Sequence, residues 1–193
     1  MRVFIVVLVL IFSFQSWTKA DDIRDFEIEG MSIGDSALDF FSKEEIKENI
    51  RDYYENMKIK KYYPVEIYKH ERFKVYDSVQ LSLKINNKDY IIDHIVGLIF
   101  YDNNINGCYE KQKEVAKELT LLFKNAEKLE TDTKHPADVT GKSKIKEINF
   151  WFKLGDVVGA DCYDWSDKMD YVDHLRVGML SDEYNTWLEN EQQ

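Results

Sequence analysis

Apolar and polar residues alternate in the middle of the chain. From Val79 to Ile85 every second residue is apolar, which is the period of a strand with one wet face. Asn86 and Asn87 then provide a turn that tolerates positive φ, and residues 90–101 return as a mostly apolar strand. This pattern predicts a hairpin, to which residues 65–69 add a further strand.

Helical patterns occur both before and after this hairpin in the sequence. Residues 32–35 and 42–45 both read Ser-x-x-acid, the form of a capping box, so two short helices are expected near the N-terminus. After the hairpin, apolar residues from Cys108 to Ala126 fall on one side of a helix that has lysines and glutamates opposite. We expect this helix to pack on the sheet.

The C-terminal part of the chain predicts a second set of strands. Residues 129–144 contain Pro136 and Gly141 and little periodicity, which is typical of an exposed connection. Strand signals follow in residues 145–154, 157–165 and 171–179, and Ser181 is placed to cap a last helix. Grouped strands predict an α+β fold in which two meanders form an antiparallel sheet, or sheets, with helices packed on one face.

The first residues have the three parts of a secretory signal peptide. A basic start, an apolar run over residues 3–14 and small residues before Asp21 predict cleavage after Ala20. The run is shorter than the roughly 20 residues that span a bilayer, although an uncut anchor is the alternative. We therefore expect a signal peptide at 1–20 and a periplasmic or secreted domain at 21–193 with no membrane span, comprising sub-halves 21–128 and 145–193 joined by 129–144.

The net charge and composition of the chain narrow the classes of partner that we expect. The full chain has a formal net charge of −10, and removal of residues 1–20 takes away two bases and no acid. Such a balance repels phosphate backbones and anionic lipids, so nucleic acid and membrane surfaces are not expected partners. An aromatic content of 14% indicates an ordered domain. The partner remains an unidentified protein or small ligand.

Cys108 and Cys162 are the two cysteines of the chain. In an oxidising compartment such a pair favours a disulfide, and the alternative is two buried thiols. Their spacing matches no zinc pattern, so no metal is expected there.

Two Asp-His pairs, Asp93-His94 and Asp173-His174, each stand at or near the beginning of a predicted strand. Carboxylates that orient imidazoles occur at metal sites and in proton transfer. Neighbours in a strand point to opposite faces, however, so neither aspartate easily reaches its own histidine. A hydrolase or metal-dependent enzyme that uses these four residues is the alternative function.

The segment with Asp102, Asn104 and Asn106 resembles the first half of a calcium loop. A calcium loop requires an acidic residue at its twelfth position, and this chain has Lys113 there, so the loop lacks its strongest ligand. The other interpretation is an ordinary strand-to-helix turn with a helix cap.

No nucleophile elbow, His-Glu-x-x-His, P-loop or dinucleotide motif is present. The sequence therefore favours a non-catalytic binding or interaction module without a cofactor, in which the sheet surface and its aromatic residues meet the partner. Trp151, Trp165, Trp187 and Tyr163 are candidates for a sugar or apolar platform, or for the core.

Residues 25–42 (DFEIEGMSIGDSALDFFS), behind the predicted signal peptide, resemble the start of a group of small exported proteins of marine alphaproteobacteria. That group has no established activity, so the resemblance implies export alone. The Gly-Met-Ser start followed by meanders is also similar to small periplasmic lipoproteins of the outer-membrane assembly type, but this chain lacks their lipidation cysteine.

Overall fold

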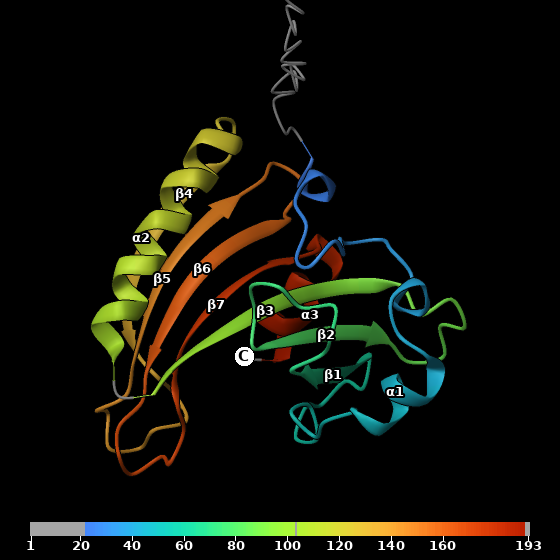
Figure 1. Ribbon diagram of the computed structural model, residues 1–193, viewed down its shortest axis with the longest axis horizontal. Coiled ribbons are helices and arrows are strands. Elements are labelled where there is room, and N and C mark those ends of the chain that lie inside the picture. The colour runs from blue at the N-terminus through green and yellow to red at the C-terminus, as the bar shows by residue number, and fades with distance from the viewer. Residues whose placement is uncertain (1–21, 103, 192–193) are drawn as a thin grey trace, which may run out of the picture.

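The computed structural model describes residues 22–102 and 104–191, which form one antiparallel sheet of seven strands. The strands are β1 (Tyr62–Tyr68), β2 (Ser78–Lys84), β3 (Ile92–Asp102), β4 (Glu127–Lys134), β5 (Lys144–Trp151), β6 (Val157–Asp164) and β7 (Asp173–Leu180). Their order across the sheet is β1-β2-β3-β7-β6-β5-β4 (Figure 1). The predicted α+β class and antiparallel sheet are confirmed.

The central pairing of β3 with β7 joins the two predicted meanders into a single sheet. Phe100 lies opposite His174 and His94 lies opposite Leu180, so the two strands pair along most of their length. Because side chains alternate between faces, His94, Phe100, His174 and Leu180 all point to the same side of the sheet. This shared side contains the site described below.

One face of the sheet, here called the α2 face, is covered by helix α2 (Ile105–Leu122). The predicted disulfide is confirmed: Cys108 of α2 is bonded to Cys162 of β6, and both are fully buried. One turn further along the helix, Nε2 of Gln112 donates to the carbonyl oxygens of Lys146 and Ala160, at 2.6 and 2.7 Å. A covalent bond and two buried hydrogen bonds therefore fix the helix on β5 and β6.

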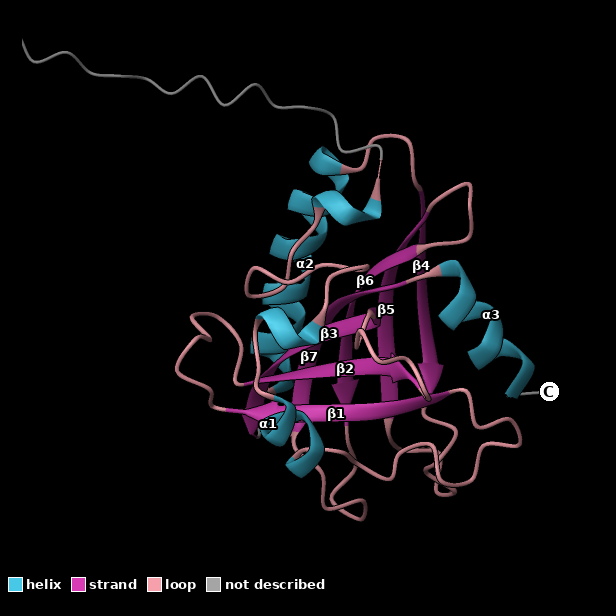
Figure 2. Ribbon diagram, turned by 90° about the vertical axis from the view of Figure 1, so that its right-hand side faces the viewer, coloured by secondary structure: helices cyan, strands magenta, loops and turns pink. Residues whose placement is uncertain are grey.

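Helix α3 (Asp182–Glu191) lies on the opposite face of the sheet, here called the α3 face (Figure 2). Its Tyr184 stacks on His94, and its Trp187 packs against Tyr62 of β1. Ser181 caps it as predicted, since its Oγ accepts a hydrogen bond from the amide of Tyr184 at 3.2 Å. The helices thus occupy both faces of the sheet, whereas the pattern predicted one face, because Tyr184 and Trp187 form a second, smaller core there.

The N-terminal region forms one of the two predicted capped helices. The capping box at Ser42 is present, and α1 (Lys43–Glu48) begins after it. At Ser32 the amide does bond to the carboxylate of Asp35, but the hydroxyl donates to the carbonyl of Phe26 and no helix begins there. Two 3-10 turns lie on either side of Ser32 in the chain, Ile23–Asp25 and Ala37–Asp39, and the second is capped by Ser36.

The expected connection at 129–144 is partly a strand. β4 begins at Glu127 and continues to Lys134, paired with β5 along its whole length, so the connection is confined to residues 135–143. Nearly all of β4 is exposed, which explains why it has no apolar alternation. The two expected sub-halves therefore share one sheet.

The two edges of the sheet differ. The segment at residues 49–51 covers the outer edge of β1 through two backbone hydrogen bonds, Glu66 to Asn49 and Arg51 to Pro64. The outer edge of β4 carries alternating charged residues, which oppose pairing with other strands.

Residues 1–20, the predicted signal peptide, lie outside the described residues. Within residues 22–102 and 104–191, no helix is sufficiently long and apolar to cross a membrane.

Candidate functional site

The two Asp-His pairs do not converge. His94 and His174 both point to the α3 face, but they stand at opposite ends of the paired strands β3 and β7. His94 lies six residues from Phe100, the partner of His174, which is a separation of about 20 Å along the strands. The structure therefore does not bring these histidines into one site.

His94 belongs to a buried hydrogen-bonded cluster under α3. Its Nδ1 and the hydroxyl of Ser82 are 3.0 Å apart, and its ring stacks on Tyr184 with centroids separated by 4.7 Å. Tyr54 completes the cluster through hydrogen bonds to Ser82 and Tyr184, at 2.8 and 2.5 Å. Burial lowers the pKa of His94 to about 3, so this imidazole is neutral at physiological pH.

His174 lies at the other end of the face. Its Nδ1 is 2.8 Å from the carbonyl oxygen of Val172, a contact in which the ring N–H donates. Its ring stacks on Tyr163 with centroids 4.9 Å apart. Burial lowers the pKa of His174 to about 4, and this ring is likewise neutral.

The aspartates of the two pairs have other partners. Asp93 lies 3.4 Å from the ammonium of Lys84, and Oδ1 of Asp173 accepts a hydrogen bond from the amide of Trp165 at 2.8 Å. Burial raises the pKa of both carboxyl groups. Each aspartate therefore has a contact with a residue other than its neighbouring histidine, although Oδ2 of Asp93 is buried without a hydrogen-bond partner among the described residues.

The segment that resembles half of a calcium loop forms a helix start. Asn104 is the N-cap of α2, and its Oδ1 accepts a hydrogen bond from the amide of Gly107 at 3.2 Å. Asp102 ends β3 with a φ of 41°, and Asn106 is exposed in the first turn of the helix. No cluster of three or more His, Cys, Asp or Glu side chains suited to a metal occurs in the part of the chain that the structure describes.

The sequence did not reveal a polar row that crosses β5, β6 and β7 on the α3 face. Glu147, Asp161 and Arg176 lie directly opposite one another in neighbouring strands. Arg176 extends across β3 to donate to Oε1 of Gln80 at 2.9 Å. At the other end of the row, Thr131 of β4 donates to Glu147 at 2.6 Å.

Asp161 is the unusual member of this row. Its Oδ1 is buried and has no hydrogen-bond partner among the described residues. Burial raises the pKa of Asp161 to about 7, and the nearby carboxylate of Glu147 raises it further than Arg176 lowers it. Near neutral pH this carboxyl group can therefore both donate and accept a hydrogen bond.

Aromatic rings border the polar row. The guanidinium of Arg176 lies 5.5 Å from the ring centroid of Tyr163, which also stacks on His174. Trp165 continues the border, with His135 at 4.2 Å and Tyr171 at 4.8 Å between ring centroids. Nε1 of Trp165 is buried without a hydrogen-bond partner among the described residues. We call the polar row and these rings together the polar-aromatic face: Gln80, His135, Glu147, Asp161, Tyr163, Trp165, Tyr171, His174 and Arg176.

The four residues of the predicted aromatic platform do not gather in one place. Tyr163 and Trp165 belong to the polar-aromatic face and are half-buried, whereas Trp187 is buried between Tyr62 and Tyr184. Trp151 lies on β5, with its Nε1 buried and unpartnered within the described residues.

The polar-aromatic face places polar and charged groups beside aromatic rings. It combines the carboxyl group of Asp161, whose pKa is close to neutral pH, with the guanidinium of Arg176 and the amide of Gln80. Together with the neighbouring ring faces, these groups can bind a ligand that carries hydroxyl groups and has a flat apolar side. A local signal was present in the sequence, since Arg176 interrupts the otherwise apolar strand from Leu175 to Leu180.

No protein-family model matches the chain, and no curated protein or solved structure is significantly similar to it.

Proposed function

We propose that this protein is an exported, non-catalytic binding module whose ligand site is the polar-aromatic face. The expected ligand is a small neutral molecule with several hydroxyl groups and one apolar side, as in a sugar ring. Two considerations support export: the N-terminal sequence pattern and the buried disulfide, which is typical of oxidising compartments.

The buried Oδ1 of Asp161 carries the proposal. A buried polar atom without a partner costs about 1–3 kcal/mol, and a ligand hydroxyl that bonds to Oδ1 of Asp161 would remove that cost. Asp161 lies between Glu147 and Arg176, and a ligand hydroxyl that reached this position would meet three charged or titrating groups at once. Hydrogen bonds to such groups are stronger than those between neutral partners.

The adjacent rings supply the apolar half of the site. Tyr163 and Trp165 are half-buried, and their ring centroids lie 5.9 Å apart. A ligand whose hydroxyls face Asp161 would place its C–H side toward these rings. Burial of that apolar surface contributes roughly 25 cal/mol per Å².

Titration by NMR tests this function. Amide resonances of the ¹⁵N-labelled protein would be followed during addition of glucose, galactose, N-acetylglucosamine and maltose, each to tens of millimolar. We expect at least one sugar to produce saturable shifts that cluster on residues of β5, β6 and β7. Saturable shifts confined to other elements, or none with any of the four sugars, would contradict the proposal.

Two variants locate the site. Asp161→Ala and Arg176→Gln should each weaken sugar binding by about tenfold, because a hydrogen bond to a charged or titrating group contributes about 1.5 kcal/mol or more. Thr133→Ala is the matched control: this exposed residue is on the same face, at the sheet edge, and should leave the affinity unchanged.

A further inference from the structure

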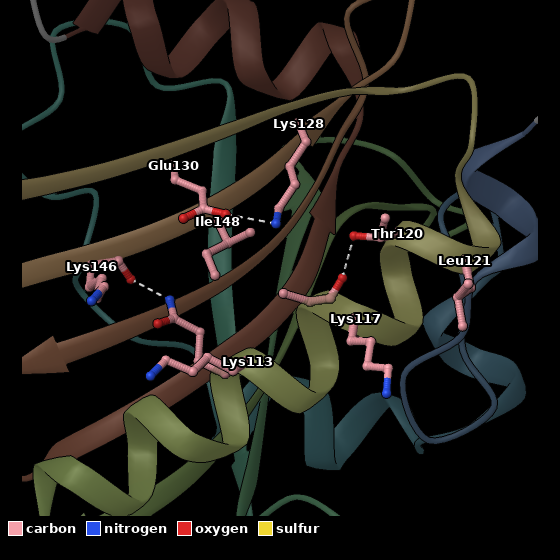
Figure 3. A pocket seen from close by; sticks show the side chains of 10 residues that line it. Lys113, Lys117, Thr120, Leu121, Lys128, Glu130, Lys146 and Ile148 are labelled. Carbon is pink, nitrogen blue, oxygen red and sulfur yellow. Dashed lines mark hydrogen bonds and ion pairs between the residues drawn. The ribbon is translucent and has the colours of Figure 1, made fainter.

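A groove runs along the α2 face between helix α2 and the edge formed by β4 and β5. It exists because the disulfide and Gln112 fix α2 over β5 and β6, which leaves β4 uncovered beyond the helix. The groove has a volume of about 400 Å³, within the range of small-molecule sites (Figure 3). We call it the lysine groove, after four of its lining residues: Lys113, Lys117, Lys128 and Lys146.

The charge of this groove is opposite to that of the molecule. Four lysines and one acid, Glu130, line it, although the chain as a whole has a net charge of −10. Lys128 is paired with Glu130 at 2.7 Å, and the ammonium of Lys146 lies 5.2 Å from the ring centroid of Tyr109. The groove therefore retains an excess of positive charge.

Lys113 and Lys117 make the largest contribution to that excess. They lie one turn apart on α2, and within the described residues neither forms an ion pair. Like charges at this spacing destabilise a helix. A bound anion would remove that repulsion.

The remaining lining is apolar. Ala116 of α2 and Ile148 of β5 are buried below the lysines, and Leu121 is 52% exposed at the end of the groove. Inorganic anions gain nothing from such a surface, whereas an organic anion with a hydrocarbon part buries it. The lysines and this floor together match an amphipathic anion.

We propose that the lysine groove binds a small organic anion with an apolar body, in which the anionic group contacts Lys113 and Lys117 and the hydrocarbon lies along Ala116, Leu121 and Ile148. This site is separate from the polar-aromatic face, since it lies on the other side of the sheet. The outcome of a test at one of these sites therefore does not affect the proposal for the other.

Isothermal titration of the oxidised protein with decanoate tests the proposal. We expect saturable binding of one decanoate per chain. Decanol has a similar hydrocarbon tail without the charge, and inorganic phosphate has the charge without the tail, so each should bind at least about tenfold more weakly. Equal affinity for decanol or for phosphate would overturn the proposal, and so would the absence of decanoate binding.

Charge-matched variants then localise the bound anion. The double variant Lys113→Gln with Lys117→Gln should lower decanoate affinity by about tenfold, because two ammonium contacts contribute together about 1.4 kcal/mol. Lys58→Gln with Lys153→Gln is the control: both residues are exposed and neither lines the groove, and the change in net charge is the same. An equal loss in the control would show a general charge effect and overturn the site.

Leu121→Gln tests the apolar part. Leucine and glutamine have similar helix propensities, so the exposed substitution should leave the fold intact. Decanoate affinity should fall by several-fold, while binding of acetate stays as weak as before. Unchanged decanoate affinity would overturn the placement of the hydrocarbon.

Discussion

Gly159 of β6 and Gly178 of β7 lie directly opposite each other in the middle of the sheet. A Cβ atom added at Gly178 would lie 2.4 Å from the carbonyl oxygen of Ile95 and 2.7 Å from Cα of Val96, both backbone atoms of β3. At Gly159 the nearest atom, at 2.3 Å, is Oδ1 of the Asn149 side chain. The two glycines thus face obstacles of different rigidity.

Gly178→Ala should therefore destabilise the protein by about 2–3 kcal/mol, since the central β3–β7 pair must separate to admit a methyl group. Gly159→Ala should lower the free energy of unfolding by about 1 kcal/mol or less, because the side chain of Asn149 can rotate away. Urea unfolding followed by circular dichroism measures both values. Equal losses at the two positions would show that β3 and β7 are not held as tightly as described.

Reduction of the disulfide should lower the free energy of unfolding by about 4 kcal/mol. The bond between Cys108 and Cys162 closes a loop of 54 residues, and the entropy of that loop in the unfolded chain gives this magnitude. Denaturant unfolding with and without dithiothreitol measures the loss. The double variant Cys108→Ala with Cys162→Ala is the control, and its stability should not respond to the reductant.

Asp161→Asn should stabilise the protein at alkaline pH. The pKa of Asp161 is about 7 in the folded protein, whereas an aspartate in an unfolded chain titrates near pH 3.9. As the pH rises between these values the unfolded chain loses the proton first, so stability decreases through this window. The side chain of the Asp161→Asn variant does not ionise, so its stability does not decrease in this pH window.

At pH 8 the gain should be about 2–4 kcal/mol, and near pH 4 it should almost vanish. Urea unfolding at the two pH values measures it, with the exposed Asp167→Asn as a control that changes stability little at either. A variant less stable than the wild type at pH 8 would mean that the ionised carboxylate has a stabilising partner.

Export predicts the mature N-terminus. The protein expressed from its full sequence in a secreting bacterial host should be recovered from the periplasm or medium with Asp21 as its first residue. N-terminal sequencing by Edman degradation identifies that residue. Recovery in the cytosol with Met1 in place would contradict both the signal peptide and the compartment on which the disulfide depends.

Local sequence patterns predicted the elements that expose one face to solvent or that begin with a recognisable helix cap. The alternation from Val79 to Ile85 identified β2, and the Ser42 capping box identified the start of α1. β4 was missed because it lies at an edge with almost all of its residues exposed, so burial imposes no apolar period on Glu127–Lys134.

The polar-aromatic face could not be assembled from the sequence. Asp161 and Arg176 are neighbours because the consecutive strands β6 and β7 pair, whereas Gln80 of β2 joins them only because β7 also pairs with β3. No local signal specifies the pairing of β3 with β7, which are far apart in the chain. The sequence did contain the Asp-His pairs, but the antiparallel register of β3 and β7 places them at opposite ends.

The position of β7 between β3 and β6 also imposes an order on folding. A chain that emerges from its N-terminus completes β1, β2 and β3 while the inner edge of β3, rich in isoleucine and valine, has no strand beside it. That edge is covered only when β7 has been made. Until then the nascent protein exposes an unpaired apolar strand edge, which can pair with other chains and favours aggregation.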